Sequence, residues 1–236
     1  MAWLRRSVRQ GEDVAFEDVT EQWAVLGLMG PRSGDIAKAL GLADITDLGF
    51  FRHGVSEFAG TAIRAARLSY VGEPGWEISM PAQVAPAFYR AVADQGVGPA
   101  GMFAQTSMRI EKGFLSYGHD LDTDINPMQA GLEFVISWGS DFTGRQALQS
   151  KRDIQPDSVM TTIILDDENA NPIGNEPVYQ EGVIVGKTTS AAFGYRVGKP
   201  VALALVDPGS LTASSVEVDI AGIRSTGSIR SGPAYP

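Results

Sequence analysis

The sequence contains no cysteine among its 236 residues, and it has only two histidines, His53 and His119. The lack of cysteine excludes disulfides, cysteine-ligated zinc, iron–sulfur clusters and thiol nucleophiles. Two histidines are too few for a three-histidine metal site. The longest apolar runs, such as Val201–Val206, fall far short of the roughly 20 residues that a membrane-spanning helix needs.

Basic residues are also scarce relative to acidic ones. The chain has 19 Lys and Arg against 28 Asp and Glu, which gives a formal net charge of −9. Nonspecific binding to nucleic acid or to an anionic membrane needs a cationic face, so neither is an expected partner. The glycine-rich fingerprints of dinucleotide-binding folds and of P-loops are missing as well, which argues against direct binding of FAD, NAD or ATP by those routes.

The N-terminal segment carries three arginines in its first nine residues and then turns acidic. No apolar h-region follows, so the segment is not a secretory signal. We expect the end of an amphipathic helix, with Trp3, Leu4 and Val8 on one side. The sequence favours the cytoplasm as the compartment and leaves the mitochondrial matrix open.

The first 150 residues or so mix predicted strands and helices, which indicates an α+β fold. Strands are expected at 23–29, 54–58, 61–70, 77–80 and 131–137. Helices are expected at 35–40, 81–95, 101–112 and 144–151. An Ala-Gly pair at 59–60 predicts a hairpin between the second and third strands.

The pattern changes near residue 153, after which short apolar runs alternate with turns rich in Asn, Gly and Pro. Strands are expected at 161–165, 177–179, 183–189, 201–206, 216–220 and 225–229. Short strands at such spacing are typical of a small barrel or a sandwich. We therefore expect an α+β domain over 1–152 and a β domain over 153–236.

The segment from Tyr70 to Glu77 reads Y-V-G-E-P-G-W-E, which predicts a tight turn between two strands. One interpretation is an ordinary solvated turn. Another is a binding site, because a glutamate at the foot of a strand offers two acceptors in one plane. A pterin ring presents two adjacent N–H donors that match such a carboxylate bidentately, and Tyr70 could supply an aromatic face.

A second motif follows the expected helix at 101–112 and includes His119. Its carboxylates stand at alternate positions, Asp120, Asp122 and Asp124. The start of a calcium loop has this spacing, but the glycine and glutamate that such a loop needs are replaced by Ile125 and Gly131. No G-x-S-x-G elbow exists to complete a triad with His119. We expect a structural loop whose carboxylates cap neighbouring N–H groups.

Taken in chain order, several segments resemble the glycine cleavage T-proteins, which are aminomethyltransferases. They are Asp18–Pro31, Tyr70–Glu77, Met108–Gly113, Gly118–Leu121, Asn126–Leu132 and Asp141–Leu148. The E-K-G and G-H-D-L elements lean toward the branch that is fused to dimethylglycine and sarcosine dehydrogenases. The resemblance covers essentially the whole chain.

The resemblance implies a tetrahydrofolate-binding fold, followed by a separate C-terminal β-barrel. It implies that a one-carbon unit is accepted from an aminomethyl or methylamine donor, with formation of methylenetetrahydrofolate. Carried over residue by residue, Glu77 would hold the pterin and Tyr70 would flank it. Phe134 and Phe51 fall where the family places aromatic wall residues, and no metal is implied.

The chain also departs from the family. The family's catalytic aspartate lies in an N-terminal segment that has no counterpart in this sequence, so no catalytic residue is assigned and the folate-binding domain is expected to be N-terminally incomplete. An arginine of the family is replaced by Gln105. FAD is expected only through an absent domain or a partner. We thus expect the isolated chain to be inactive and to need an upstream segment or an FAD-containing subunit.

Two further hypotheses stay open beside the one-carbon transfer module. The chain could be a noncatalytic folate-binding-like module that keeps a pocket without the chemistry. It could also be an assembly subunit of an amine-oxidising complex, in which its acidic surface docks a larger subunit.

Overall fold

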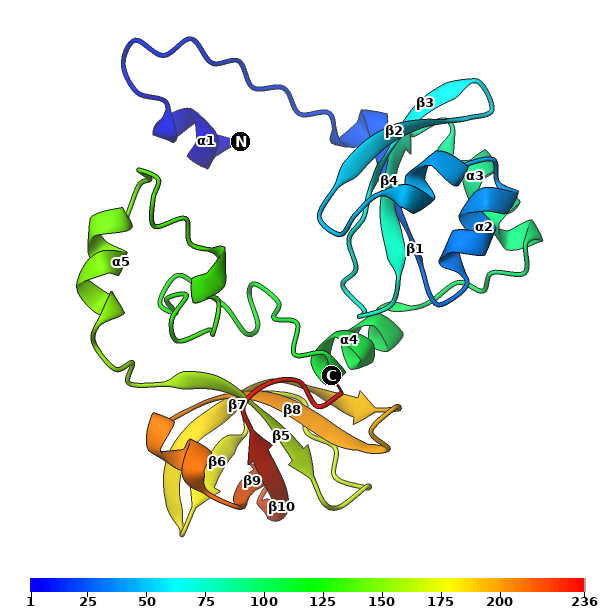
Figure 1. Ribbon diagram of the computed structural model, residues 1–236. Helices are drawn as coiled ribbons and strands as arrows, with labels where there is room; N and C mark the ends of the chain where they lie inside the picture. The colour runs from blue at the N-terminus through cyan, green and yellow to red at the C-terminus, as the bar shows by residue number, and fades with distance from the viewer. Residues whose placement is uncertain (236) are drawn as a thin grey trace. The chain divides into compact units, whose positions relative to one another are not determined.

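The computed structural model describes residues 1–235 and divides into two compact units, Met1–Pro99 and Ala100–Pro236 (Figure 1). It mixes helices with sheet and ends in a closed barrel, which confirms the predicted fold class. The predicted domain boundary between residues 152 and 153 stays a prediction. Pro236, the last residue of the predicted β domain, lies outside the described residues.

The first unit is built around a four-stranded antiparallel sheet with the order β1-β4-β3-β2. Its elements are α1 (Ala2–Ser7), η1 (Thr20–Gln22), β1 (Trp23–Met29), α2 (Ser33–Ala39), η2 (Ala43–Asp47), β2 (His53–Phe58), β3 (Thr61–Ala66), β4 (Gly75–Pro81) and α3 (Ala85–Asp94). Ala59 and Gly60 both have positive φ, at 51° and 78°. Such a two-residue turn matches the twist of the flanking strands, so the predicted hairpin is confirmed.

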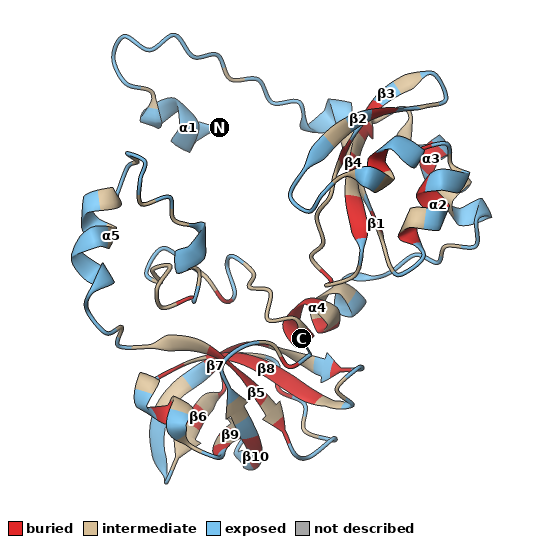
Figure 2. Ribbon diagram, in the orientation of Figure 1, coloured by how far each residue is buried: buried red, intermediate tan, exposed pale blue. Residues whose placement is uncertain are grey.

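One face of this sheet is covered and the other is open (Figure 2). Strand residues such as Ile63 and Ile78 pack with α2, η2 and α3 in a core that includes Trp76 and Phe88. The alternate residues of the same strands point the other way, and Val55 is 67% exposed there. This one-sided burial is the usual state of an antiparallel sheet, whose side chains alternate with period two. Helix α1 confirms a helix at the N-terminus, but it ends at Ser7, so Val8 lies outside it, and none of its residues is buried.

The second unit contains three helical segments before the barrel. Its elements are α4 (Met102–Glu111), η3 (Glu133–Val135), α5 (Arg145–Arg152), β5 (Val159–Leu165), β6 (Pro177–Gln180), β7 (Val183–Gly194), β8 (Lys199–Val206), η4 (Pro208–Thr212), β9 (Val216–Ile220) and β10 (Ile223–Arg230). The strand predicted at 131–137 is wrong. That apolar run pairs with no other strand among the described residues, and it forms the single helical turn η3 after Gly131, whose φ is 69°.

The six strands close into a barrel with the order β10-β5-β8-β7-β6-β9. Of the two architectures that the sequence allowed, the barrel is therefore correct and the sandwich is not. Its interior is a cluster of aliphatic side chains that includes Ile163, Leu165 and Val218. All six predicted strands are confirmed, although β7 runs on to residue 194. A β-bulge interrupts β7 between Thr188 and Ser190.

A buried ion pair joins α4 to the loop that follows it, and both of its partners hydrogen-bond to the barrel. Arg109 is 5% exposed and Asp120 is fully buried, and the Arg109 Nη1 to Asp120 Oδ2 distance is 2.7 Å. Nη2 of Arg109 donates to Ser190 Oγ at 2.8 Å, and the Thr189 hydroxyl donates to Asp120 Oδ1 at 2.5 Å. Glu111, two residues further along α4, accepts from the backbone N–H groups of residues 196 and 197. Helix α4 is therefore fixed to β7 and to the loop after it through polar contacts.

The loop that carries Asp120 is held by its own hydrogen bonds. The N–H of Ser116 donates to Asp120 Oδ2 at 2.8 Å, and the N–H of Thr123 donates to Asp122 Oδ1 at 2.6 Å. The carboxylates thus cap neighbouring N–H groups, as the sequence predicted. Asp120 does more than the prediction stated, because its second oxygen reaches the barrel.

We expect Asp120→Ala to lower the free energy of unfolding of the second unit by about 3–5 kcal/mol, because it leaves a buried guanidinium without its counter-ion. Calorimetric unfolding of the full chain measures the change. The matched control is Asp122→Ala, two residues away and exposed, which should change stability by less than about 1 kcal/mol. Equal losses in the two variants would contradict the assignment of the ion pair as the main contact.

Candidate functional site

Glu77 stands on the open face of the first unit's sheet, near the start of β4. It pairs with Gly27 of β1 on one side and with Ala66 of β3 on the other. Its neighbours in the strand, Trp76 and Ile78, point into the core and are 1% and 0% exposed. Glu77 itself is half-buried, so its carboxylate lies at the boundary between the sheet and solvent.

The turn before Glu77 is anchored to the sheet. The carbonyl oxygen of Pro74 accepts from the N–H of Gly30 at 2.8 Å and from the hydroxyl of Ser33 at 2.9 Å. The indole N–H of Trp76 donates to the carbonyl oxygen of Ile45 at 2.9 Å, inside the core. These contacts come from three different segments of the chain. The turn is therefore a fixed structure, which disfavours its interpretation as a merely solvated loop.

Two of the aromatic residues that were predicted to line the binding site lie at the same end of the sheet as Glu77. Tyr70 is half-buried in the connection between β3 and β4. Phe51 lies two residues before β2, has a φ of 61° and is 73% exposed. Its N–H donates to the carbonyl oxygen of Arg67, one residue after β3 ends, at 3.0 Å. The structure thus brings Phe51, Tyr70 and Glu77 to one end of one sheet.

Phe134, the fourth predicted residue, belongs to η3 in the second compact unit and is 80% exposed. Its expected role as an aromatic wall residue stays a prediction.

The open face also carries groups that sequence patterns did not single out. His53 of β2 is exposed and pairs with Ala66 of β3, so it shares the cross-strand row of Glu77. Farther along the face, the guanidinium of Arg64 lies 5.4 Å from the ring centre of Trp23. The only signal for these residues is the pairing register, which the sequence does not reveal before the sheet is known.

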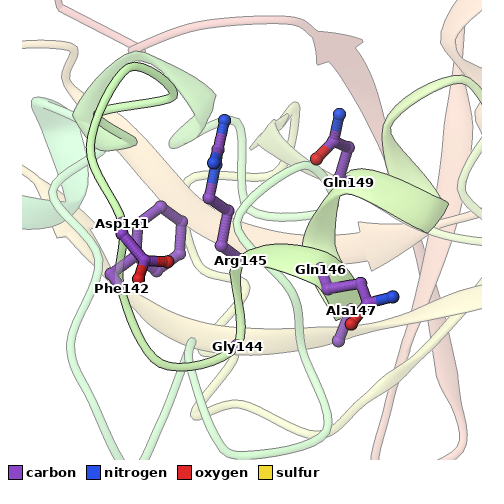
Figure 3. A pocket seen from close by; sticks show the side chains of 7 residues that line it. All are labelled: Asp141, Phe142, Gly144, Arg145, Gln146, Ala147 and Gln149. Carbon is purple, nitrogen blue, oxygen red and sulfur yellow. The ribbon is translucent and has the colours of Figure 1, made fainter.

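A separate pocket of about 510 Å³ lies in the second unit, at the start of α5 (Figure 3). It is lined by Asp141, Phe142, Gly144, Arg145, Gln146, Ala147 and Gln149. The guanidinium of Arg145 donates through Nη2 to the carbonyl oxygen of Trp138 at 2.9 Å, while its Nε is buried without a partner in the described part of the chain. None of the four predicted binding residues lines this pocket.

Over residues 1–235, no group of three acidic or histidine side chains is arranged to hold a metal ion. The helices of the same residues are all too short or too polar to cross a membrane.

Two family models match the chain. Residues 1–140 match the model described as GCVT N-terminal domain. Residues 159–236 match the model described as glycine cleavage T-protein C-terminal barrel domain. Together they cover the mixed α+β part and the closed barrel.

Curated relatives align over nearly the whole chain. Mitochondrial dimethylglycine dehydrogenase of Rattus norvegicus is 32% identical over 235 residues, covering 94% of this chain and 27% of that protein. An aminomethyltransferase of Moorella thermoacetica is 33% identical over 229 residues, covering 94% of this chain and 62% of that protein. The mitochondrial pyruvate dehydrogenase phosphatase regulatory subunit of Mus musculus is 32% identical, and the match covers 94% of this chain and 28% of that protein. The chain therefore spans about a quarter to under two thirds of the length of these relatives.

Among solved structures, the glycine cleavage system aminomethyltransferase T of Bartonella henselae superposes with a TM-score of 0.80. The sequences are 24% identical, and the match covers 89% of this chain and 58% of that one. This likeness establishes a shared fold.

Gly75 begins β4, and a side chain at this position would meet backbone. A Cβ atom there would lie 2.6 Å from the carbonyl oxygen of Leu28 and 2.8 Å from Cα of Met29. We expect Gly75→Ala to destabilise the first unit by about 1–3 kcal/mol, because β1 and β4 must move apart next to Glu77. Chemical denaturation followed by circular dichroism measures the loss.

Gly98→Ala is the matched control, because a Cβ at Gly98 meets nothing within 4 Å. We expect that control to change the free energy of unfolding by less than about 0.5 kcal/mol. A Gly75→Ala chain as stable as its parent would show that the pairing of β1 and β4 is looser than the structure indicates.

Proposed function

Because this chain belongs to the glycine cleavage T-protein family, we propose that its first compact unit binds tetrahydrofolate on the open face of the sheet. Glu77 is the principal ligand residue in this proposal. The observation that carries it is the position of Glu77, which is half-buried on an open sheet face at the end of an anchored turn.

The chemistry of the ligand fits the carboxylate. The pterin ring presents an exocyclic amine and a neighbouring ring N–H, and both can donate to the two oxygens of Glu77. Charge-assisted, bidentate hydrogen bonds of this kind are stronger than neutral ones and fix the ring's orientation. Partial burial of Glu77 reduces competition from water, which favours the paired state.

The aromatic residues complete the proposed site. Tyr70 flanks the pterin and Phe51 contributes an aromatic wall, which is supported by their location at the same end of the sheet as Glu77. Phe134 is proposed as a further wall residue on the strength of the resemblance alone. Tyrosine and phenylalanine offer flat apolar faces against which a heterocycle packs.

We propose that the chain serves as the folate-binding module of a one-carbon transfer. In the reaction type of the family, an aminomethyl or methylamine donor passes its one-carbon unit to tetrahydrofolate, and methylenetetrahydrofolate forms. The names of the relatives, aminomethyltransferase and dimethylglycine dehydrogenase, support this reaction type. Turnover is proposed to involve an FAD-containing partner, in line with the resemblance to the dehydrogenase branch of the family. The cytoplasm or the mitochondrial matrix is the proposed compartment.

A second candidate function is a noncatalytic module, and the name of one relative supports it. The 32% identical mouse protein is named as a phosphatase regulatory subunit. Binding of tetrahydrofolate without formation of methylenetetrahydrofolate, even with an aminomethyl donor and the FAD-containing partner present, would favour this alternative over the transfer module.

We expect Glu77→Gln to weaken tetrahydrofolate binding by about 10- to 100-fold, because hydrogen bonds to a charged group contribute about 1.5–3 kcal/mol. Isothermal titration calorimetry with the full chain measures the affinity. The matched control is Glu57→Gln, since Glu57 is exposed on β2 and pairs with Ala62, away from the Glu77 row. Equal affinity of the Glu77→Gln chain and its parent would refute the role of Glu77.

A further inference from the structure

The cavity at the start of α5 holds two opposite charges that do not neutralise each other (Figure 3). Among its lining residues, Asp141 supplies the carboxylate and Arg145 the guanidinium. The two side chains form no ion pair with each other, and the carboxylate of Asp141 meets no donor anywhere in residues 1–235. Opposite charges that line one cavity without mutual contact are both available to a ligand.

The guanidinium of Arg145 also carries a donor that is buried and unused. Its Nε has no hydrogen-bond partner within the part of the chain that the structure describes. A buried N–H without an acceptor costs free energy, so such groups are rare in folded proteins. Nη2 donates to the carbonyl oxygen of Trp138 and has a second hydrogen. A guanidinium edge with two N–H donors is the group that binds a carboxylate through two parallel hydrogen bonds.

The first turn of α5 adds donors to the same cavity. The N–H groups of Gln146 and Ala147 find no acceptor among residues 1–235. Gly144, the N-cap residue, has no side chain to cap them, and the first turn contains no acidic residue. The N-terminal end of a helix carries a partial positive charge that favours an anion. The helix therefore supports the same kind of ligand group as the free edge of Arg145.

The carboxylate of Asp141 decides which kind of anion fits. It repels phosphate and any other ligand whose charge is only negative. A ligand with an ammonium group beside its carboxylate instead meets complementary charge at both ends. Phe142 lines the cavity as well, and aromatic ring faces attract ammonium groups.

The size and the exposure of the cavity limit the ligand further. Its volume of about 510 Å³ falls within the range of about 300–1,000 Å³ that is usual for small-molecule sites. Most of its lining residues are exposed, and Arg145 and Phe142 are half-buried. Such a lining favours a small polar ligand over an apolar one.

We propose that this cavity binds a small amino acid in its zwitterionic form. Arg145 and the first turn of α5 bind the carboxylate of the ligand, and Asp141 binds its ammonium group. The site lies in the second unit, whereas Glu77 belongs to the first. The inference therefore does not depend on the proposed binding of tetrahydrofolate.

Glycine is the probe, because it is the smallest zwitterion of this class. It is titrated into the full chain, and binding is followed through the backbone amide resonances of Gln146 and Ala147 by nuclear magnetic resonance. We expect both resonances to shift and to saturate. Acetate and methylamine each carry one half of the charge pair, so each should bind at least about tenfold more weakly than glycine.

Two substitutions separate the two ends of the ligand. Asp141→Asn should weaken glycine at least about tenfold, while acetate should bind no more weakly than to the parent chain. Arg145→Lys keeps the charge but removes the two-donor edge, so it should weaken both glycine and acetate. Asp153→Asn is the matched control, since Asp153 is exposed at the C-terminal end of the same helix and does not line the cavity. Its affinity for glycine should equal that of the parent chain.

Several results would overturn the proposal. One is a parent chain whose two amide resonances do not respond to glycine, and another is an Asp141→Asn chain that binds glycine as the parent does. Acetate or phosphate that binds at least as tightly as glycine would rule out the zwitterion. Equal losses in the Asp141 and Asp153 variants would show that the effect is not local. If Arg145→Lys lowers the melting temperature, Asp141→Asn decides alone, because Asp141 is exposed and its replacement breaks no contact in residues 1–235.

Discussion

The antiparallel pairing of β4 with β1 and β3 is the constraint on which the candidate site depends. Side chains alternate between the two faces of a strand, so a slip of one residue would exchange the faces. Trp76 and Ile78 would then leave the core, and the carboxylate of Glu77 would enter it at a large desolvation cost. The hydrogen bonds that hold the turn at Pro74 oppose such a slip. The hydrophobic core and the polar face are thus set by one register.

The two units use different means to fix their local geometry. In the first, a one-sided sheet packs its apolar face on α2, η2 and α3 and leaves the other face open. In the second, a closed barrel has no free strand edge, and α4 is attached to it by charged and polar contacts. A buried ion pair adds little net stability compared with apolar packing of similar shape. Its contribution is a single orientation of α4 relative to the loop of Asp120, and the hydroxyls of Thr189 and Ser190 hold both partners on β7.

Short-range features could be predicted from the sequence, and long-range ones could not. The hairpin at Ala59-Gly60 and the barrel strands follow from local turn chemistry and alternation, and the structure confirms them. The strand predicted at 131–137 failed because an apolar run becomes a strand only if a partner strand pairs with it. The residues beside Glu77 were not foreseen, since Gly27 pairs with it across 50 positions of chain. The contact of Arg109 with Ser190 spans 81 positions and is equally invisible to local patterns.

The bulge in β7 explains how two consecutive residues meet the same ion pair. In a regular strand, Thr189 and Ser190 would point to opposite faces. The extra residue at the bulge breaks this alternation, so one hydroxyl reaches Asp120 and the next reaches Arg109. The two contacts consequently depend more on the number of residues in the bulge than on which of serine and threonine stands at each position. A single-residue deletion would turn one hydroxyl away from the pair, whereas exchanging serine and threonine would leave both hydroxyls in place.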